Sequence, residues 1–218
     1  MPALHLKIDL HTHSTYSDGL GRPEDILEGA REKGLDGLAI TDHHTLDGYF
    51  SVRDMEGDLL IIPGFEVETE AGHILVLGLE ELPSGIEGIS YEELIGWVRE
   101  RSGLTVIAHP AISRFHMAEW NRSKPDAVEV LNAMYPLQFF VQRGLRLSQR
   151  MGLPALGGSD AHNHFTVGDA YSVVDVEKAN VEEVLMAIKG GLVSYYGNLS
   201  PVRSRLKIGV DYLKSVLF

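Results

Sequence analysis

The sequence contains no cysteine. This absence excludes disulfide bonds, thiolate nucleophiles and zinc sites built on cysteine. Any metal site in this chain must therefore use imidazole and carboxylate groups. Such ligands suit Zn, Mn or Fe, with Mg as a further option, and not the softest metals.

Long apolar runs are also absent, and no stretch is long enough to cross a bilayer. The first seven residues lack an apolar core followed by a small-residue cleavage site, so they do not resemble a secretory signal. We therefore expect a cytoplasmic protein with no membrane partner.

Basic residues are scarce: 19 Lys and Arg face 31 Asp and Glu, which gives a net charge of −12. Broad affinity for nucleic acid normally needs a basic patch, so this balance favours a small phosphorylated substrate. Nucleic acid stays open as a partner, because a metal-lined cleft can bind phosphate inside an acidic protein.

The 218 residues suit a single α/β domain, since short apolar runs alternate with amphipathic segments. This alternation predicts a parallel sheet with helical crossovers. Strands are expected at 4–10, 38–40, 59–62, 74–79, 104–108, 127–131, 155–156, 171–174 and 192–196, and helices at 23–33, 90–101, 137–150 and 180–189.

The last segment, 201–218, is expected to lie outside a barrel domain that spans 1–200. Val210, Leu213, Val216 and Leu217 recur at roughly helical spacing. They predict a helical tail that packs on the barrel or on a partner subunit, which leaves a homo-oligomer as one option.

His11 and His13 follow the first predicted strand. Residues i and i+2 of an extended chain point to the same side, so both rings can reach one metal ion. Asp18, in Ser17-Asp18-Gly19, is either a turn residue or a further ligand. After the second strand, His43 and His44 are adjacent, so at most one of them is expected to face a given metal. Asp42 is a candidate for orienting a histidine.

Three further groups follow apolar runs. Glu66 stands where burial of an acid is costly unless it is paired or bound to metal. His73 begins the run at 74–79, where a hydrogen-bonded edge residue is the alternative to a ligand. His109 precedes Pro110, which predicts an extended backbone at His109.

Asp160 and His162 form a second i, i+2 pair, after a strand that ends in Gly157-Gly158. Each of these residues alone has an ordinary structural explanation. Together they place histidines and acids after five predicted strands, at the edge where parallel α/β folds carry their active sites. We therefore expect a site with enough nitrogen and oxygen ligands for two or three metal ions.

The order of these motifs resembles the polymerase and histidinol phosphatase (PHP) domain family. The matching stretches are Asp9-Leu10-His11-Thr12-His13-Ser14, Ser17-Asp18-Gly19, Thr41-Asp42-His43, Gly64-Phe65-Glu66, Ala108-His109-Pro110 and Gly158-Ser159-Asp160-Ala161-His162. The resemblance implies an α/β fold, specifically a distorted (β/α)7 TIM-like barrel with a trinuclear metal cluster at the C-terminal face of the strands.

The resemblance also implies which residues bind metal. One ion would take His11, His13, Glu66 and Asp160. A second would share Glu66 and add His73 and His109. A third would take Asp18, His43 and His162, although some family members have histidine where this chain has Asp18.

The expected activity is hydrolysis of a phosphoester by metal-bound water. His43, His44 or His162 could protonate the leaving group. Arg114 and His116 are candidates for substrate binding, with an exposed loop as the alternative, and Arg203 and Arg205 are weaker candidates. Glu129 and Asn132 are expected either to support the site or to form a structural pair.

Other readings remain open. The substrate could be a small metabolite or nucleotide, or a short oligonucleotide cleaved by a 5'-3' or 3'-5' exonuclease. Amidohydrolase barrels also begin with His-x-His, and they usually need a bridging lysine or acid. No lysine follows a predicted strand here, Glu66 could bridge instead, and Asp160-Ala161-His162 favours the PHP family. A non-catalytic PHP module should have lost ligands, whereas all nine positions carry metal-capable side chains.

Overall fold

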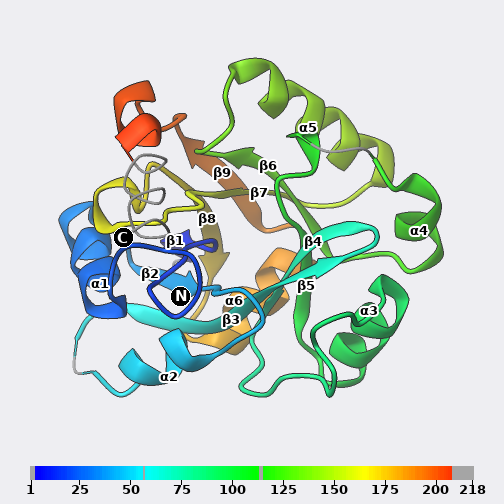
Figure 1. The fold of residues 1–218 in the computed structure, drawn as a ribbon, viewed down its shortest axis with the longest axis horizontal. Coiled ribbons are helices and arrows are strands. Elements are labelled where there is room, and N and C mark those ends of the chain that lie inside the picture. Colours follow the sequence, from blue (N-terminus) through cyan, green and yellow to red (C-terminus); the bar gives the residue numbers. More distant parts are fainter. Residues whose placement is uncertain (1–2, 56, 113–114, 208–218) are drawn as a thin grey trace, which may run out of the picture.

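The computed structural model describes residues 3–55, 57–112 and 115–207 (Figure 1). Within these residues, nine strands form one mixed sheet in the order β7-β6-β5-β4-β3-β2-β1-β8-β9. The strands are β1 (Leu4–Asp9), β2 (Gly37–Ile40), β3 (Leu60–Thr69), β4 (Gly72–Leu77), β5 (Leu104–Ile107), β6 (Ala127–Asn132), β7 (Ala155–Gly158), β8 (Ala170–Val176) and β9 (Val193–Gly197).

Helices surround this sheet (Figure 1). They are α1 (Pro23–Glu32), α2 (Asp47–Val52), α3 (Tyr91–Glu100), α4 (Met117–Arg122), α5 (Gln138–Met151) and α6 (Val181–Lys189), with short 3-10 turns η1 (Pro110–Ile112) and η2 (His164–Thr166). Every strand and helix expected from the sequence has a counterpart. The sequence analysis did not predict α2, α4 or the two 3-10 turns, and β3 continues to Thr69 instead of ending at residue 62.

The expectation of a parallel sheet is wrong for part of the molecule. β1, β2 and β3 are parallel neighbours, as are β5, β6 and β7, but β4 is antiparallel to both β3 and β5. The reason is the connection between β3 and β4: Thr69 pairs with Gly72, so only two residues join the strands. Such a short link forms a hairpin and cannot make a crossover.

The sheet curls into a nearly closed barrel, as the family resemblance implies. β8 is antiparallel to β1 and β9 is antiparallel to β8, which brings both strands back beside β7. Closure there uses a side chain: Gly157 N donates to Ser172 Oγ, and Ser172 Oγ donates to Gly157 O, both at 3.0 Å. Where β7 and β8 meet, a serine hydroxyl thus makes the hydrogen bonds that backbone groups make between regularly paired strands.

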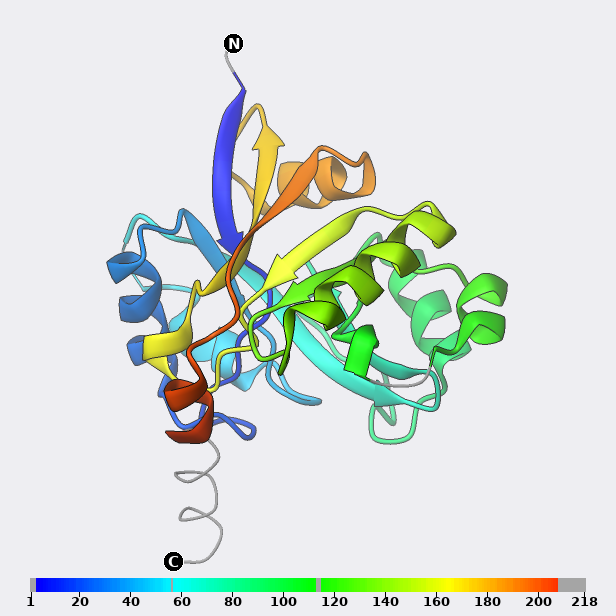
Figure 2. The ribbon, with the colours of Figure 1, turned by 90° about the horizontal axis from the view of Figure 1, so that it is seen from above.

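One end of the barrel is covered by α6 (Figure 2). Val184 and Ile188 of this helix are fully buried in one apolar cluster with Leu6 of β1 and Leu104 of β5. The helix begins at Asn180, whose side chain accepts a hydrogen bond from Glu183 N, as its sequence predicts. Because this end is packed with apolar side chains, the opposite end, where β1 and β7 terminate, is the one available for a site.

The β3–β4 hairpin is held in place by buried aromatic residues. Trp120 of α4 is 1% exposed, and its Nε1 donates to Ala71 O in the hairpin turn at 3.0 Å. Tyr91 of α3 is also buried, and its backbone N–H donates to Glu70 Oε2 in the same turn at 3.0 Å. α3 and α4 therefore fix the hairpin that carries Glu66 and His73.

After β9, the chain returns to the end where β1 and β7 terminate, and residues 202–207 form helical turns there (Figure 2). Val210, Leu213, Val216 and Leu217 lie outside the described residues, so the helical tail and the domain boundary at residue 200 stay predictions. Among the described helices, none combines the length and apolarity that a membrane span requires.

Candidate metal centre

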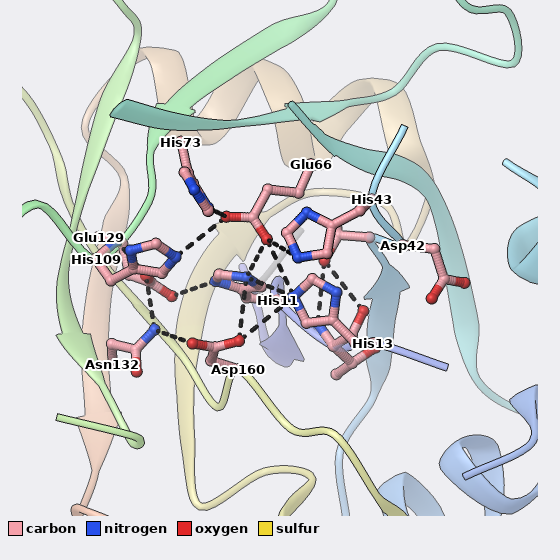
Figure 3. Close-up of polar contacts among 12 residues, drawn as sticks. His11, His13, Asp42, His43, Glu66, His73, His109, Glu129, Asn132 and Asp160 are labelled. Atoms are coloured by element: carbon pink, nitrogen blue, oxygen red, sulfur yellow. Dashed lines mark hydrogen bonds and ion pairs between the residues drawn. The ribbon is translucent and has the colours of Figure 1, made fainter. Parts of the chain in front are cut away.

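Side chains from six neighbouring strands converge at the open end of the barrel. His11 and His13 follow β1, His43 follows β2, His109 follows β5, and Asp160 and His162 follow β7. Glu66 lies within β3, where it pairs with Leu75, and His73 lies within β4, where it pairs with Glu68. Figure 3 shows the side chains pointing toward one another for His11, His13, His43, Glu66, His73, His109 and Asp160.

The deepest part of the cluster consists of four atoms from His11, His13, Glu66 and Asp160. Nε2 of His11 lies 3.0 Å from Nε2 of His13, and these nitrogens lie 3.2 Å and 3.1 Å from Glu66 Oε2. Both nitrogens also lie 3.4 Å from Asp160 Oδ1. Both rings and Glu66 are at most 1% exposed.

The other oxygen of Glu66 faces a second pair of rings. Nδ1 of His73 lies 3.0 Å from Glu66 Oε1, and Nε2 of His109 lies 3.1 Å from the same oxygen. The two oxygens of one carboxylate thus point into two adjacent groups of imidazoles. This is the arrangement that a bridging carboxylate requires.

A third group surrounds Asp18. Nε2 of His162 lies 3.2 Å from Asp18 Oδ2, and Nε2 of His43 lies 3.8 Å from Asp18 Oδ1. His13 Nδ1 lies 3.6 Å from the same Oδ1. The structure therefore brings together all nine residues that the sequence analysis grouped as ligands.

The donor atoms fit divalent metal ions. Zinc bonds to nitrogen and oxygen are about 2.0–2.2 Å long, so adjacent ligand atoms in a tetrahedral shell lie about 3.3–3.6 Å apart. The separations of 3.0–3.4 Å around His11 Nε2 are close to these values. In addition, His13 Nδ1 is buried and has no hydrogen-bond partner among the described residues, which is costly unless another group satisfies it.

The electrostatics of the cluster favour positive charge. Burial alone would lower the pKa of His13, but Asp160 and Glu66 outweigh it and raise this pKa to about 10. Burial likewise opposes charge on His11, yet Glu129, Asp160 and Glu66 raise the pKa of His11 well above its ordinary value. Conversely, burial would raise the pKa of Glu66, but the surrounding histidines hold this pKa well below its ordinary value.

We expect metal binding to release protons, because the raised pKa values keep protons on the rings of the metal-free protein at neutral pH. The apparent metal affinity should therefore rise with pH up to about 10, because below this pKa His13 keeps a proton that the metal ion must displace. Calorimetric titrations with Mn²⁺ in buffers of different ionisation enthalpy measure this release. A heat that does not depend on the buffer would contradict it.

Glu129 and Asn132 of β6 hold the ligands from behind (Figure 3). Glu129 Oε1 lies 2.9 Å from His11 Nδ1, and its Oε2 accepts the backbone N–H of His109 at 2.7 Å. Asn132 Nδ2 donates both to Glu129 Oε2 at 3.0 Å and to Asp160 Oδ2 at 3.1 Å. From the sequence, these two residues could either support the site or form a structural pair. In the structure, their contacts connect β6 to the segments that follow β1, β5 and β7.

Asp42 holds the loop that carries Asp18. Its carboxylate accepts hydrogen bonds from Ser14 N at 2.7 Å, Ser14 Oγ at 2.6 Å and Ser17 Oγ at 2.7 Å. The expectation that Asp42 orients a histidine is therefore not what the structure shows. The sequence contained one indication of this role: Ser14 and Ser17 lie close together in Ser14-Thr15-Tyr16-Ser17, and serines in a loop often donate hydrogen bonds to a carboxylate.

Gly48 of α2 leaves the space that Asp42 occupies. A Cβ at Gly48 would overlap Asp42 Oδ2 and approach Ser14 Oγ. We expect Gly48→Ala to destabilise the protein by about 1–3 kcal/mol through overpacking, although alanine favours a helix. Gly96→Ala in α3 is the control: nothing lies near its Cβ, so it should be neutral or stabilise by up to about 1 kcal/mol. Urea unfolding measures both, and equal effects would contradict the explanation.

Asp9, at the end of β1, is a support that the sequence analysis did not assign. It is completely buried, and it accepts the backbone N–H groups of Ser159 at 2.9 Å and Gly168 at 2.8 Å. Burial raises its pKa to about 6 despite these hydrogen bonds. Asp9 thereby ties the segment that carries Asp160 to the segment that carries His11.

The backbone is strained at the cluster. Of the four described non-glycine residues with positive φ, three belong to this region: His44 at 57°, His109 at 29° and Asp160 at 53°. Each such residue costs about 1–3 kcal/mol and persists only where its surroundings hold it. The extended geometry predicted for His109 is therefore wrong, because Glu129 and Glu66 fix its backbone and ring in another conformation.

His43 and His44 diverge, as their adjacency predicts. His43 Nε2 lies 3.8 Å from Glu66 Oε2, inside the cluster. His44 lies at its edge, where its Nε2 accepts the backbone N–H of Glu68 at 3.2 Å. The ring proton of neutral His44 is consequently on Nδ1.

The predicted substrate-binding residues have different outcomes. Arg114 lies outside the described residues. His116 is half-buried, and its ring contacts Trp120 at a centroid distance of 6.0 Å in a surface depression of about 490 Å³. Arg203 is exposed, whereas Arg205 is partly buried and donates to Tyr135 O at 2.6 Å.

The fold and the cluster define a class of protein: an α/β barrel with a histidine- and carboxylate-rich centre at the carboxyl ends of its strands. The sequence profile of the PHP domain matches residues 9–126, more than half of the chain, and a PHP-associated profile matches residues 141–193. The chain therefore belongs to the PHP domain family.

Three similar sequences bear on this family. An uncharacterised protein of Methanocaldococcus jannaschii is 34% identical over 48% of this chain and 68% of its own length. A phosphoribosyl 1,2-cyclic phosphate 1,2-diphosphodiesterase of Eggerthella lenta is 43% identical over 34% of this chain and 31% of its own. A 5'-3' exoribonuclease of Escherichia coli is 28% identical over 78% of this chain and 52% of its own. The match thus spans about a third and about half of the lengths of the two relatives with a named activity.

Solved structures support the fold. PsfC from Pseudomonas syringae superposes with a TM-score of 0.75 over 98% of this chain and 99% of its own, at 18% identity. A two-domain protein from Bacteroides vulgatus, described as containing a PHP-like metal-dependent phosphoesterase, gives a TM-score of 0.72 over 96% of this chain and 70% of its own, also at 18% identity.

Proposed function

We propose that this protein hydrolyses phosphoesters with the help of two or three divalent metal ions. The observation that carries the proposal is the position of Glu66, whose two oxygens each face a separate group of histidines. Divalent ions in such shells acidify water and neutralise the charge that develops on phosphoryl oxygens.

The family resemblance implies three ligand sets. The groups of mutually close ligand atoms in the structure overlap with these sets, although they place His13 with Asp18 and His43, and His43 with Glu66 and His73. His11, His13, Glu66 and Asp160 would hold one ion, and Glu66 with His73 and His109 a second. Asp18, His43 and His162 would hold a third, where the separations of 3.2–3.8 Å are the widest. Nitrogen and oxygen donors suit Zn, Mn or Fe, with Mg as a further option.

The supporting residues preorganise this centre. Asp9, Glu129 and Asn132 hold the ligand-bearing strand ends, while Asp42 holds the loop of Asp18. We propose that His44 donates a hydrogen bond from Nδ1 to the leaving-group oxygen and stabilises the negative charge that develops there, because its Nε2 accepts the backbone N–H of Glu68 and the ring proton is on Nδ1. In His44→Ala, kcat should fall most for substrates with poor leaving groups, and an equal fall for p-nitrophenyl phosphate would contradict this role.

A small phosphorylated metabolite or nucleotide is the substrate class that we propose. The net charge of −12 supports it, since extended nucleic acid favours a basic surface. A 5'-3' or 3'-5' exonuclease on short oligonucleotides is the second candidate, because the relatives include a 5'-3' exoribonuclease. A cytoplasmic location and a homo-oligomer remain predictions from the sequence.

A screen of phosphorylated metabolites, nucleotides and short oligonucleotides tests the proposal, with Mn²⁺, Zn²⁺ and Fe²⁺ supplied separately. We expect metal-dependent release of phosphate or mononucleotides from at least one class. A cyclic amide serves as the control for the amidohydrolase alternative. Amide hydrolysis without phosphoester hydrolysis, or no hydrolysis with any metal, would overturn the proposal and leave a non-catalytic module as the explanation.

A further inference from the structure

Two buried side-chain nitrogens lack a hydrogen-bond partner among the described residues: His13 Nδ1 and Arg205 Nε. The first belongs to the candidate metal centre. The second lies far away in the sequence and outside both profile matches, which end at residues 126 and 193. A buried donor without an acceptor is destabilising, so Arg205 calls for an acceptor.

Arg205 is fixed at the same end of the barrel as the cluster. It lies in the helical turns at 202–207, which Figure 2 shows beyond the tips of β1 and β7. Its NH1 donates to Tyr135 O at 2.6 Å, and Ser200 N donates to Ala133 O at 2.8 Å. Two contacts therefore hold this segment of the chain against the turn that follows β6.

That turn leads directly to the cluster. Tyr135 N donates to Asn132 O at 3.1 Å, which closes the turn, and Asn132 Nδ2 donates to Asp160 Oδ2 at 3.1 Å. Tyr135 Oη accepts the backbone N–H of Ala111, two residues after His109, at 3.4 Å. Arg205 is thus connected, through the turn that follows β6, to Asp160 and to the segment that carries His109.

The guanidinium of Arg205 has no carboxylate partner among the described ion pairs, although acids outnumber bases in this chain. The NH1 group of the guanidinium donates to the Tyr135 carbonyl. The N–H groups on Nε and on the other terminal nitrogen are then left to donate to one ligand as a pair. Paired N–H groups of this kind match two oxygens of one phosphoryl group.

We propose that Arg205 binds a phosphoryl group of the ligand at the mouth of the cluster. This inference rests on the proposed function, since it assumes that the ligands of this centre are phosphorylated. It makes the segment after β9 a part of the binding site, and the acceptor that Nε lacks is an anionic oxygen.

Inorganic phosphate is the probe, because its binding does not require hydrolysis. Calorimetry on the full-length, Mn²⁺-loaded protein should give a phosphate Kd about 10- to 100-fold weaker in Arg205→Ala than in the wild type. Arg205→Lys should be intermediate, because lysine keeps the charge and reaches Tyr135 O but lacks the paired N–H groups. Metal stoichiometry should be unchanged in both.

Arg203→Ala is the matched control, since it removes the same charge from an exposed position two residues away. We expect its phosphate Kd to stay within about twofold of the wild type, because exposed charges are well screened. Where a substrate is known, Arg205→Ala should raise KM more than it lowers kcat. If Arg205→Ala unfolds, Arg205→Lys alone decides.

An unchanged phosphate Kd in the Arg205 variants, or an equal loss in Arg203→Ala, overturns the inference. So does a wild-type protein that binds metal but no phosphate. Failure of the proposed function is a separate result: the wild type would hydrolyse no phosphoester, whatever the phosphate affinity of the variants.

Discussion

Glu66→Gln should abolish metal-dependent hydrolysis, with kcat/KM at least about 10³-fold lower than in the wild type. Glu66 Oε2 lies 3.2 Å and 3.1 Å from the Nε2 atoms of His11 and His13, and Oε1 lies 3.0 Å from His73 Nδ1. Glutamine has the same shape as glutamate but no negative charge. Its side-chain NH₂ would also replace one carboxylate oxygen that faces the ring nitrogens, and an NH₂ group cannot bind a metal ion there. One substitution thereby affects two ion positions.

The measurement combines kinetics with metal content determined by elemental analysis. Glu182→Gln in α6 is the control, because this exposed acid lies on the helix that covers the opposite end of the barrel. Glu182→Gln should retain wild-type kcat/KM and metal content. A Glu66→Gln protein that keeps both its metal and its activity would contradict a bridging role.

Glu129→Ala should weaken metal binding by about 10- to 100-fold, the usual effect of removing a group that orients a metal ligand. Glu129 lies 2.9 Å from His11 Nδ1 and accepts the backbone N–H of His109 at 2.7 Å. Without its carboxylate, the His109 N–H and Asn132 Nδ2 lose a buried acceptor. We therefore also expect a loss of stability of about 1–3 kcal/mol.

Asp126→Asn separates these two effects. Asp126 accepts hydrogen bonds from Thr105 N and Oγ at the other end of β5 and β6, both at 2.8 Å. Its replacement should lower stability without changing the Mn²⁺ affinity measured by calorimetry. If Glu129→Ala and Asp126→Asn weakened Mn²⁺ binding equally, Glu129 would have only a structural role.

Much of the grouping of the metal-capable residues could be predicted because it depends on local rules. In an extended chain, His11 and His13 share a side, and Asp160 and His162 do the same. The carboxyl ends of neighbouring parallel strands meet at one edge, which brings distant pairs together. These rules do not place Asp18, in the loop after β1, or His73, near the start of β4, and both residues joined the group through the family resemblance.

The supporting residues could not be assigned in the same way. Glu129 lies in a strand whose residues are all buried, so its neighbours do not show which face it occupies. Asp9 and Asp42 accept from backbone N–H groups of Ser159 and Ser14, and which N–H groups need an acceptor depends on the tertiary structure. The conformation of His109 is determined likewise by Glu129 and Glu66, which override the local influence of Pro110.

The antiparallel position of β4 was detectable in principle. Glu70 and Ala71, followed by Gly72, form a short link between two strand-forming segments and favour a hairpin, and Gly72 has a φ of 98° in the structure. The general rule that alternating strands and helices give a parallel sheet obscured this signal. As a result, the sequence analysis placed His73 correctly in the cluster but not on a hairpin strand.

The central claim is that this cluster binds the metal ions that drive phosphoester hydrolysis. The most direct test is to titrate Mn²⁺ into chelator-treated protein while measuring phosphate release, with Glu66→Gln alongside. We expect no release from the metal-free protein, activity that rises and saturates at two to three bound ions, and none in the variant. Phosphate release that persists without bound metal, or an equal recovery in Glu66→Gln, would contradict it.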